Sequence, residues 1–109
     1  MPVSTKIRLC EPSSLTPELG KRLAAAGSAW ITVHARHVNA KRRRAGPADL
    51  GVVKTFKEKL AAEGFANVPI VSNGNVGTWG HIVENRKETE ADGIMVGESL
   101  LDNPWYEVF

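Results

Sequence analysis

The chain of 109 residues has a single cysteine, Cys10, and it has 10 glycines and 6 prolines. One thiol cannot form an internal disulfide, which excludes a small disulfide-stapled domain and fits a reducing compartment. The glycine and proline content lies far below that of a collagen-like or low-complexity chain, which excludes both. No run approaches the roughly 18 apolar residues that cross a bilayer, and residues 1–6 hold no apolar stretch of a secretory signal. We therefore expect an intracellular protein, cytoplasmic or nuclear, with no membrane partner.

A large excess of charge is also missing, because 14 Lys and Arg stand against 12 Asp and Glu. The positive charges are nevertheless clustered, and no acid follows them until Asp49. Such a cluster is either a solvated surface loop or a segment that contacts nucleic-acid phosphates. Its members are Arg36, Lys41, Arg42, Arg43 and Arg44.

Short apolar runs alternate with helical patterns along the chain. The runs over residues 3–9, 30–34, 68–72 and 93–96 predict four strands. Thr16, Asp49 and Thr78 each stand where a helix N-cap is expected, and Gly27 and Gly64 where the first two helices end. The apolar stripes predicted for the three helices are Leu19, Leu23 and Ala26; Leu50, Val53, Phe56 and Leu60; and Trp79, Ile82 and Val83.

Strands that are each followed by a helix predict an α/β protein with a parallel sheet. Two architectures fit, a doubly wound sheet and a run of units from a (β/α)8 barrel. No Gly-rich dinucleotide fingerprint follows any strand, and polar residues stand at the strand ends, where barrels carry their functional residues. We favour the barrel. Because a full barrel needs about 250 residues, four parallel βα units are expected to be half of one, with the N-terminal half missing.

Four positions should meet at the carboxyl edge of this sheet: Lys6, His34, Asn73 and Gly97. Lys6 lies either on a solvent-exposed strand face or in the barrel mouth, where it could hold negative charge on a ligand. His34 and His37 have metal-pair spacing, but no third ligand stands near them, so we predict no metal site. His34 is either a structural histidine or a donor to a ligand.

Two turns follow the last two strands. The sequence Asn73-Gly74-Asn75 is typical of a hairpin, but here it joins a strand to a helix, which exposes backbone N–H groups to an anion. Gly97-Glu98-Ser99 repeats the arrangement one unit later. Barrels frequently bind phosphate between the loops of two adjacent strands. The two turns together therefore predict a phosphate site.

Four segments carry a resemblance to a known family: TKIRL, ITVHARHVNAKRRRAGPADL, VPIVSNGNV and ADGIMVGESLLDNPW. In this order and spacing they resemble the second half of the tRNA-dihydrouridine synthase catalytic barrel, over about residues 3–105. HARHV and GES resemble the eukaryotic enzymes that act near the tRNA D-loop. The resemblance implies FMN bound on a (β/α)8 barrel, tRNA as substrate, reduction of a uridine to 5,6-dihydrouridine, and NADPH as the reductant.

The resemblance also implies roles for individual residues. Lys6 matches the lysine that contacts the flavin ring, and His34 the histidine beside it. The turns that would hold the FMN phosphate and ribityl chain contain Asn73, Gly74, Asn75, Gly97 and Glu98. Many relatives have arginine where this chain has Glu98, so only the backbone N–H of Glu98 carries over. The basic residues Arg36, Lys41, Arg42, Arg43 and Arg44 would contact the RNA.

One part of the family pattern is missing. The general acid of the family is a cysteine in an Asn-x-x-Cys-Pro stretch, whereas Cys10 is followed by Glu11 and Pro12. We therefore assign no catalytic residue. We expect residues 1–109 to be a fragment, inactive alone, that associates with the missing half of the barrel or with itself. Two alternatives stay open: another FMN- or phosphate-binding barrel oxidoreductase, and a non-catalytic RNA-binding piece.

Overall fold

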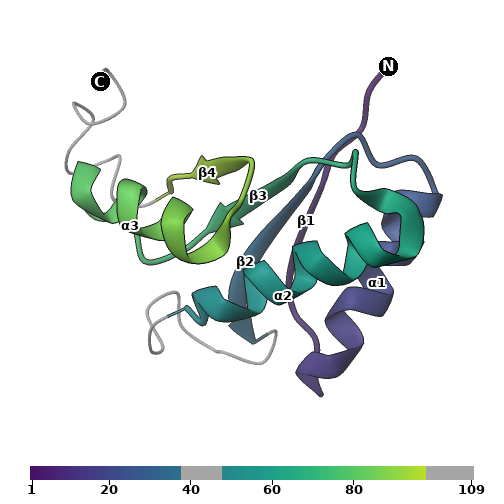
Figure 1. The fold of residues 1–109 in the computed structure, drawn as a ribbon, viewed down its shortest axis with the longest axis horizontal. Coiled ribbons are helices and arrows are strands. Elements are labelled where there is room, and N and C mark those ends of the chain that lie inside the picture. The colour runs from purple at the N-terminus through teal and green to yellow at the C-terminus, as the bar shows by residue number, and fades with distance from the viewer. Residues whose placement is uncertain (38–47, 98–109) are drawn as a thin grey trace.

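The protein forms one parallel sheet covered by helices, as the computed structural model, which describes residues 1–37 and 48–97, shows (Figure 1). The strands are β1 (Thr5–Leu9), β2 (Ile31–His37), β3 (Ile70–Asn73) and β4 (Gly93–Met95). Their order in the sheet is β1-β2-β3-β4, and each neighbouring pair is parallel. A doubly wound sheet reverses its strand order part-way, and this sheet does not. The predicted fold class, half of a (β/α)8 barrel, is confirmed.

Three helices connect the strands: α1 (Thr16–Ala25), α2 (Leu50–Leu60) and α3 (Trp79–Thr89). A short 3-10 turn, η1 (Ser13–Leu15), precedes α1, and a π turn, η2 (Ala61–Phe65), extends α2. The helices follow one another along one side of the sheet (Figure 1). Right-handed connections between strands in consecutive order produce this one-sided arrangement. None of the helices in residues 1–37 and 48–97 is both long and apolar enough to cross a membrane.

The core lies between the sheet and α2. All members of the predicted α2 stripe are buried, with Val53 and Phe56 at 0% exposure, and the prediction is confirmed. They pack with Ile31, Val33 and Ile70 of the central strands. Burying one such side chain contributes about 1.5–3 kcal/mol, so the contact between α2 and β2/β3 stabilises the middle of the fold most.

The stripe predicted for α1 is right only at Leu23, which packs against the core, while Leu19 and Ala26 are exposed. Leu19 is 36% exposed, and the buried residues are Thr16, Gly20 and Ala24. A Cβ at Gly20 would overlap the ring of Phe56. The two helices approach so closely that α1 must present small residues to α2. The hydrophobic pattern of α1 alone does not predict this requirement.

The predicted N-cap roles have mixed outcomes. The hydroxyl of Thr78 accepts from the backbone N–H of His81 at 3.3 Å, as an N-cap should. Thr16 instead lies inside the first turn of α1, and its Oγ1 accepts from the N–H of Cys10 at 2.9 Å. Asp49 precedes α2 but makes no side-chain cap bond. Thr16 thus ties the end of β1 to the helix that follows it.

The boundaries of several elements differ from the prediction. β2 runs on to His37, three residues past its predicted end, while β1, β2 and β3 begin one or two residues late. Gly27 follows α1 with φ of 100°, as a helix end should. Gly64 has a non-helical φ of 92°, which breaks the helical course where the sequence predicts its end, although η2 runs on to Phe65.

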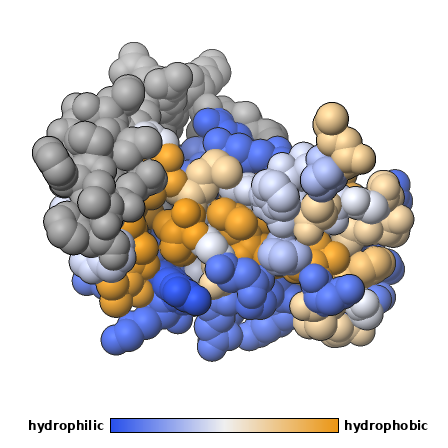
Figure 2. Space-filling model, turned by 90° about the horizontal axis from the view of Figure 1, so that it is seen from above, coloured by the Kyte–Doolittle hydropathy of each residue, from blue (hydrophilic) through white to orange (hydrophobic). Residues whose placement is uncertain are grey.

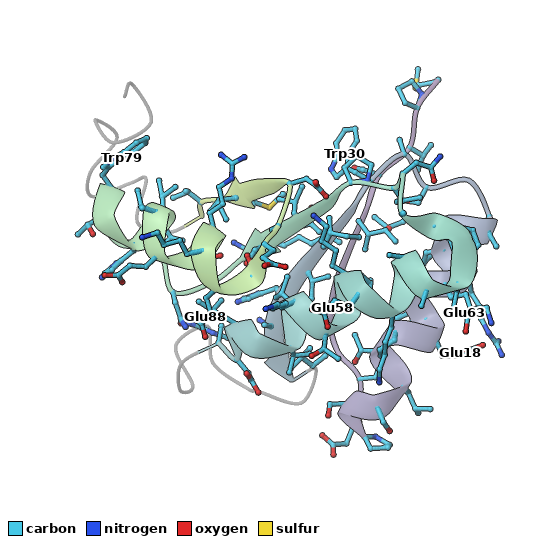
Figure 3. All side chains as sticks on the ribbon, viewed as in Figure 1. Glu18, Trp30, Glu58, Glu63, Trp79 and Glu88 are labelled. Atoms are coloured by element: carbon cyan, nitrogen blue, oxygen red, sulfur yellow. The ribbon has the colours of Figure 1, made fainter. Side chains whose placement is uncertain are left out.

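Helix α3 presents polar side chains to the protein and apolar ones to the outside. Asn85 and Thr89 are buried, whereas Trp79 is 46% and Val83 44% exposed. Trp79 projects from the start of α3, and the view from above shows hydrophobic side chains at the surface, bordered by hydrophilic ones (Figures 2 and 3). In the stripe predicted for α3, Trp79 and Val83 are therefore turned to the outside, and only Ile82 is half-buried.

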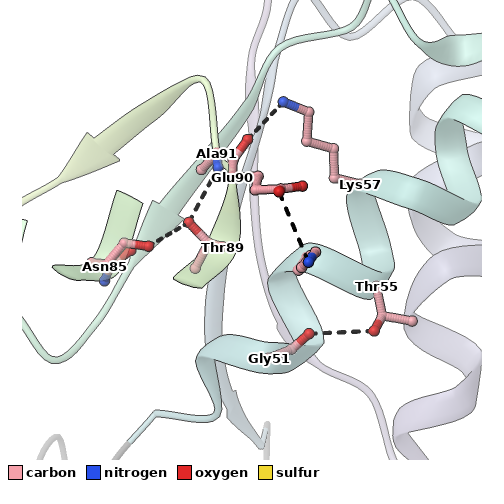
Figure 4. A network of polar contacts seen from close by, with 8 residues as sticks. Gly51, Thr55, Lys57, Asn85, Thr89, Glu90 and Ala91 are labelled. Carbon is pink, nitrogen blue, oxygen red and sulfur yellow. Dashed lines mark hydrogen bonds and ion pairs between the residues drawn. The ribbon is translucent and has the colours of Figure 1, made fainter. Parts of the chain in front are cut away.

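A polar network joins the end of α3 to α2 (Figure 4). Lys57 Nζ donates to the carbonyl of Glu90 at 2.7 Å, and Thr89 Oγ1 donates to the carbonyl of Asn85 at 2.8 Å. Lys57 also reaches the carboxylate of Asp92 at 3.2 Å, and that carboxylate accepts from the N–H of Ile70 at 2.9 Å. These bonds fix where β4 begins beside β3.

Candidate functional site

The side of the sheet away from the helices carries most of the polar strand residues. Side chains alternate between the two faces of a strand. Ile7, Val33 and Ile70 belong to or pack against the core, so Lys6, Arg8 and His34 face the other way. In a closed barrel this face is the interior, which leads to the carboxyl ends of the strands.

The strand register sets the depth of each residue on this face. Arg8, His34, Asn73 and Met95 lie side by side across the four strands. Lys6 pairs with Thr32, one layer deeper than expected. The parallel arrangement brings His34 and Asn73 together as predicted, while Lys6 lies below them and Arg8 takes the place beside His34.

Arg8 lies beside His34 among the candidate site residues, although the sequence prediction did not include it. It stands two residues after Lys6, so strand alternation alone puts both cations on one face. That alternation was the signal that could have identified it.

Positive charge surrounds His34. The pKa of His34 is lowered from 6.5 to about 4, first by burial and then by the charges of Arg36, Arg8 and Lys6, in that order of importance. The imidazole is therefore neutral at pH 7 and offers one donor and one acceptor. The Nε of Arg36 is buried without a hydrogen-bond partner in the described part of the chain. Such a cluster suits a ligand that brings negative charge.

The segment 73–75 connects β3 to α3 and forms no hairpin. Gly74 has φ of 122°, a conformation that glycine adopts readily. A Cβ at this position would lie 2.7 Å from Cβ of Ala48 and 3.4 Å from Cδ2 of His34. The turn thus packs directly against the imidazole and has no room for a side chain.

Amide side chains hold this turn from three directions. Asn73 Nδ2 donates to the carbonyl of Met95 at 2.9 Å, and Asn85 Nδ2, from α3, donates to the carbonyl of Gly74 at 2.9 Å. Asn75 Oδ1 accepts from the N–H of Ala48 at 2.9 Å, and Asn75 Nδ2 donates to the carbonyl of Ala48 at 2.8 Å. The sequence prediction did not include Asn85, whose role depends on a contact across 11 residues.

Other predicted site residues lie at or beyond the border of the described chain. Gly97 follows β4 and is exposed, and a Cβ added at this position would meet no atom within 4 Å. Glu98 and the basic residues 41–44 lie outside the described residues. Within residues 1–37 and 48–97, no group of three or more His, Cys, Asp or Glu could hold a metal ion.

Comparison with known proteins decides the family. The family described as Dihydrouridine synthase (Dus) matches residues 1–107. The chain belongs to the dihydrouridine synthase family. Its relatives include a probable tRNA-dihydrouridine synthase of Aquifex aeolicus, which is 38% identical over 96% of this chain and 31% of the relative. A tRNA-dihydrouridine(20a/20b) synthase of Saccharomyces cerevisiae is 35% identical over 94% of this chain and 26% of the relative.

The chain spans about a third of the length of these dihydrouridine synthases. A mouse protein named tRNA-dihydrouridine(20a/20b) synthase-like is 33% identical over 94% of this chain and 29% of the relative. Bacterial and eukaryotic relatives therefore both match, and the narrower assignment to the eukaryotic D-loop enzymes stays a prediction.

Proposed function

We propose that this chain acts as part of a flavin-dependent tRNA-dihydrouridine synthase, which reduces a tRNA uridine to 5,6-dihydrouridine with NADPH as reductant. The observation that supports this most is the cationic cluster of Lys6, Arg8 and Arg36 around neutral His34. It lies on the barrel-interior face of a chain that belongs to the dihydrouridine synthase family. The names of the relatives supply the reaction.

The described residues fit FMN, an anionic cofactor. The positive charges around His34 and the unpartnered Nε of Arg36 suit a ligand that accepts hydrogen bonds. The backbone of Gly74 lies directly beside His34, with no side chain between them. When bound, FMN supplies hydride transfer. We propose that Lys6 and His34 donate to the flavin ring, while the turns that contain Asn73, Gly74, Asn75, Gly97 and Glu98 hold the phosphate and ribityl chain.

The basic segment is proposed as the RNA contact. Arg36 lies at the carboxyl end of β2, and Lys41, Arg42, Arg43 and Arg44 follow it in the sequence. A tRNA uridine can reach a flavin on the barrel-interior face only if tRNA phosphates pass over this edge. We propose that this segment neutralises those phosphates, in a tRNA recognised near the D-loop.

The proposed reaction also needs groups that this sequence lacks. The family resemblance places the general acid in an Asn-x-x-Cys-Pro stretch, which does not occur here. We propose that residues 1–109 are the C-terminal half of the barrel, that a second polypeptide segment supplies the cysteine, and that the chain alone does not turn over.

The first test is FMN binding to the purified chain, followed by quenching of flavin fluorescence. Lys6→Ala should weaken binding at least tenfold, because a hydrogen bond to a charged group contributes about 1.5–3 kcal/mol. Lys59→Ala, a change of the same type on the outer side of α2, should leave binding unchanged. Equal affinity in all three proteins would remove Lys6 from the cofactor site.

The second test measures dihydrouridine in unmodified tRNA after incubation with FMN and NADPH. Product should form with the chain joined to a complementary N-terminal half and not with the chain alone. FMN binding without tRNA binding would indicate another flavin barrel. Binding of tRNA without FMN would indicate a non-catalytic RNA-binding piece.

A further inference from the structure

Asn75 holds one backbone unit with both ends of its amide. Oδ1 accepts from the N–H of Ala48 at 2.9 Å and Nδ2 donates to the carbonyl of Ala48 at 2.8 Å. The two residues are 27 positions apart, so this pair of bonds joins the turn after β3 to the start of α2. With both amide atoms engaged, the side chain of Asn75 faces Ala48 rather than the open face of the sheet.

Ala48 in turn lies against Gly74, and Gly74 lies against His34. A Cβ on Gly74 would meet Cβ of Ala48 at 2.7 Å and Cδ2 and Nε2 of His34 at 3.4 and 3.7 Å. Ala48 is 7% exposed. One packed stack is therefore formed by the methyl group of Ala48, the backbone of Gly74 and the imidazole of His34. Asn75 holds Ala48 in place at one end of this stack.

The opposite sides of this stack are also held. Asn85 Nδ2 donates to the carbonyl of Gly74 at 2.9 Å, and the N–H of Asp49 donates to the carbonyl of Ala35 at 2.7 Å. The second bond joins the residue after Ala48 to the residue after His34. With these contacts in place, Asn75 is the member whose side chain can be removed with the least change to the backbone, because its φ of 57° suits glycine.

We infer that Asn75 is a positioning residue, which fixes Ala48 against Gly74 and thereby holds the His34 imidazole in place for ligand contact. This inference rests on the proposed function and changes the role given to Asn75. Its side chain acts through His34 and not by touching the cofactor. The side-chain amide is needed at position 75 because it must accept from one backbone group and donate to another.

The test uses Asn75→Gly in the full 109-residue chain, without cofactor, and follows the His34 imidazole by NMR. Loss of the two bonds between Asn75 and Ala48 should let the His34 ring move into water. The pKa of His34 should then rise from about 4 by at least about one unit toward 6.5. Contacts between the His34 ring and the Gly74 backbone should weaken. Asn67→Gly, a matched change in the exposed loop before β3, should change neither.

Asn75→Asp supplies the graded control. A carboxylate can accept from the N–H of Ala48 but cannot donate to its carbonyl, so the His34 pKa should lie between those of the parent and Asn75→Gly. Unchanged His34 pKa and ring contacts in a folded Asn75→Gly protein would overturn the inference. This measurement on the ligand-free chain does not depend on the proposed function. A failure of the proposed function would instead appear as absent FMN binding to the parent chain.

Discussion

The protonation state of His34 depends on a few identifiable neighbours. Because Arg36 lowers the pKa of His34 more than Lys6 does, Arg36→Gln should raise that pKa further than Lys6→Gln. Adding inorganic phosphate to the parent chain should raise it too, since a bound anion offsets the surrounding positive charge. NMR titration of the imidazole measures all three. An unchanged pKa of His34 in both variants would contradict a contribution from these two charges.

The same shift makes stability depend on pH. The folded pKa of about 4 lies below the usual 6.5, so between these values the unfolded chain binds more protons than the folded one. His34 should therefore reduce stability as the pH falls from about 6.5 to about 4, with no further change below. Urea unfolding of His34→Gln should lack this part of the pH dependence. Parallel curves for parent and variant would contradict the assignment.

Gly74 and Gly97 provide a matched pair at the two predicted phosphate turns. Gly74→Ala combines an unfavourable φ of 122° with a 2.7 Å approach to Ala48, and should cost about 1–3 kcal/mol of unfolding free energy. Gly97→Ala meets nothing within 4 Å and should cost little. Chemical denaturation measures both. A Gly74→Ala protein as stable as the parent would mean that Ala48 and His34 move aside without cost.

At the scale of whole elements, α3 exposes Trp79 and Val83 of its predicted apolar face and buries Asn85 and Thr89. Asn85→Ala removes the bond to the Gly74 carbonyl in a buried position and should cost about 1–3 kcal/mol. Trp79→Gln should change stability by about 0.5 kcal/mol or less in this chain, because Trp79 is already 46% exposed. Thermal unfolding separates the two cases. A larger loss for Trp79→Gln would show that its ring is packed.

The three helices show what a sequence pattern can and cannot predict. The stripe of α2 was predictable because its residues are buried by the sheet directly beneath them. The small residues on the buried face of α1 were not predictable, because the ring of Phe56, on another helix, leaves room only for glycine at position 20. For α3, spacing identified an apolar face but not its orientation, which the bond from Asn85 to the Gly74 carbonyl helps to determine.

At the scale of the molecule, the sequence predicted four parallel strands in chain order and the meeting of His34 with Asn73, because both follow from topology. The depth of Lys6 and the engagement of Asn75 with Ala48 were not predictable, whereas strand alternation could have identified Arg8. The depth of Lys6 depends on strand register, and the bonds of Asn75 depend on a contact between segments 27 residues apart. Register and long-range contacts arise only once the whole sheet is assembled.

Within the described residues, β1 pairs only with β2 and β4 only with β3. Unpaired outer edges favour association with another chain. We expect the purified chain to sediment as a dimer or larger species, and to become a one-to-one complex when a complementary N-terminal half is added. Analytical ultracentrifugation distinguishes these states. A chain that stays monomeric and does not bind the added half would contradict the proposed barrel assembly.

The consecutive order of the strands also bears on how the protein is made. Each strand pairs with the strand before or after it in the chain. A strand that is synthesised early therefore does not need a partner strand that is synthesised much later. Synthesis adds about 5–20 residues per second, whereas loops close and helices form within microseconds. The β1-α1-β2 unit can therefore assemble as it leaves the ribosome, and each later unit adds to a template already formed.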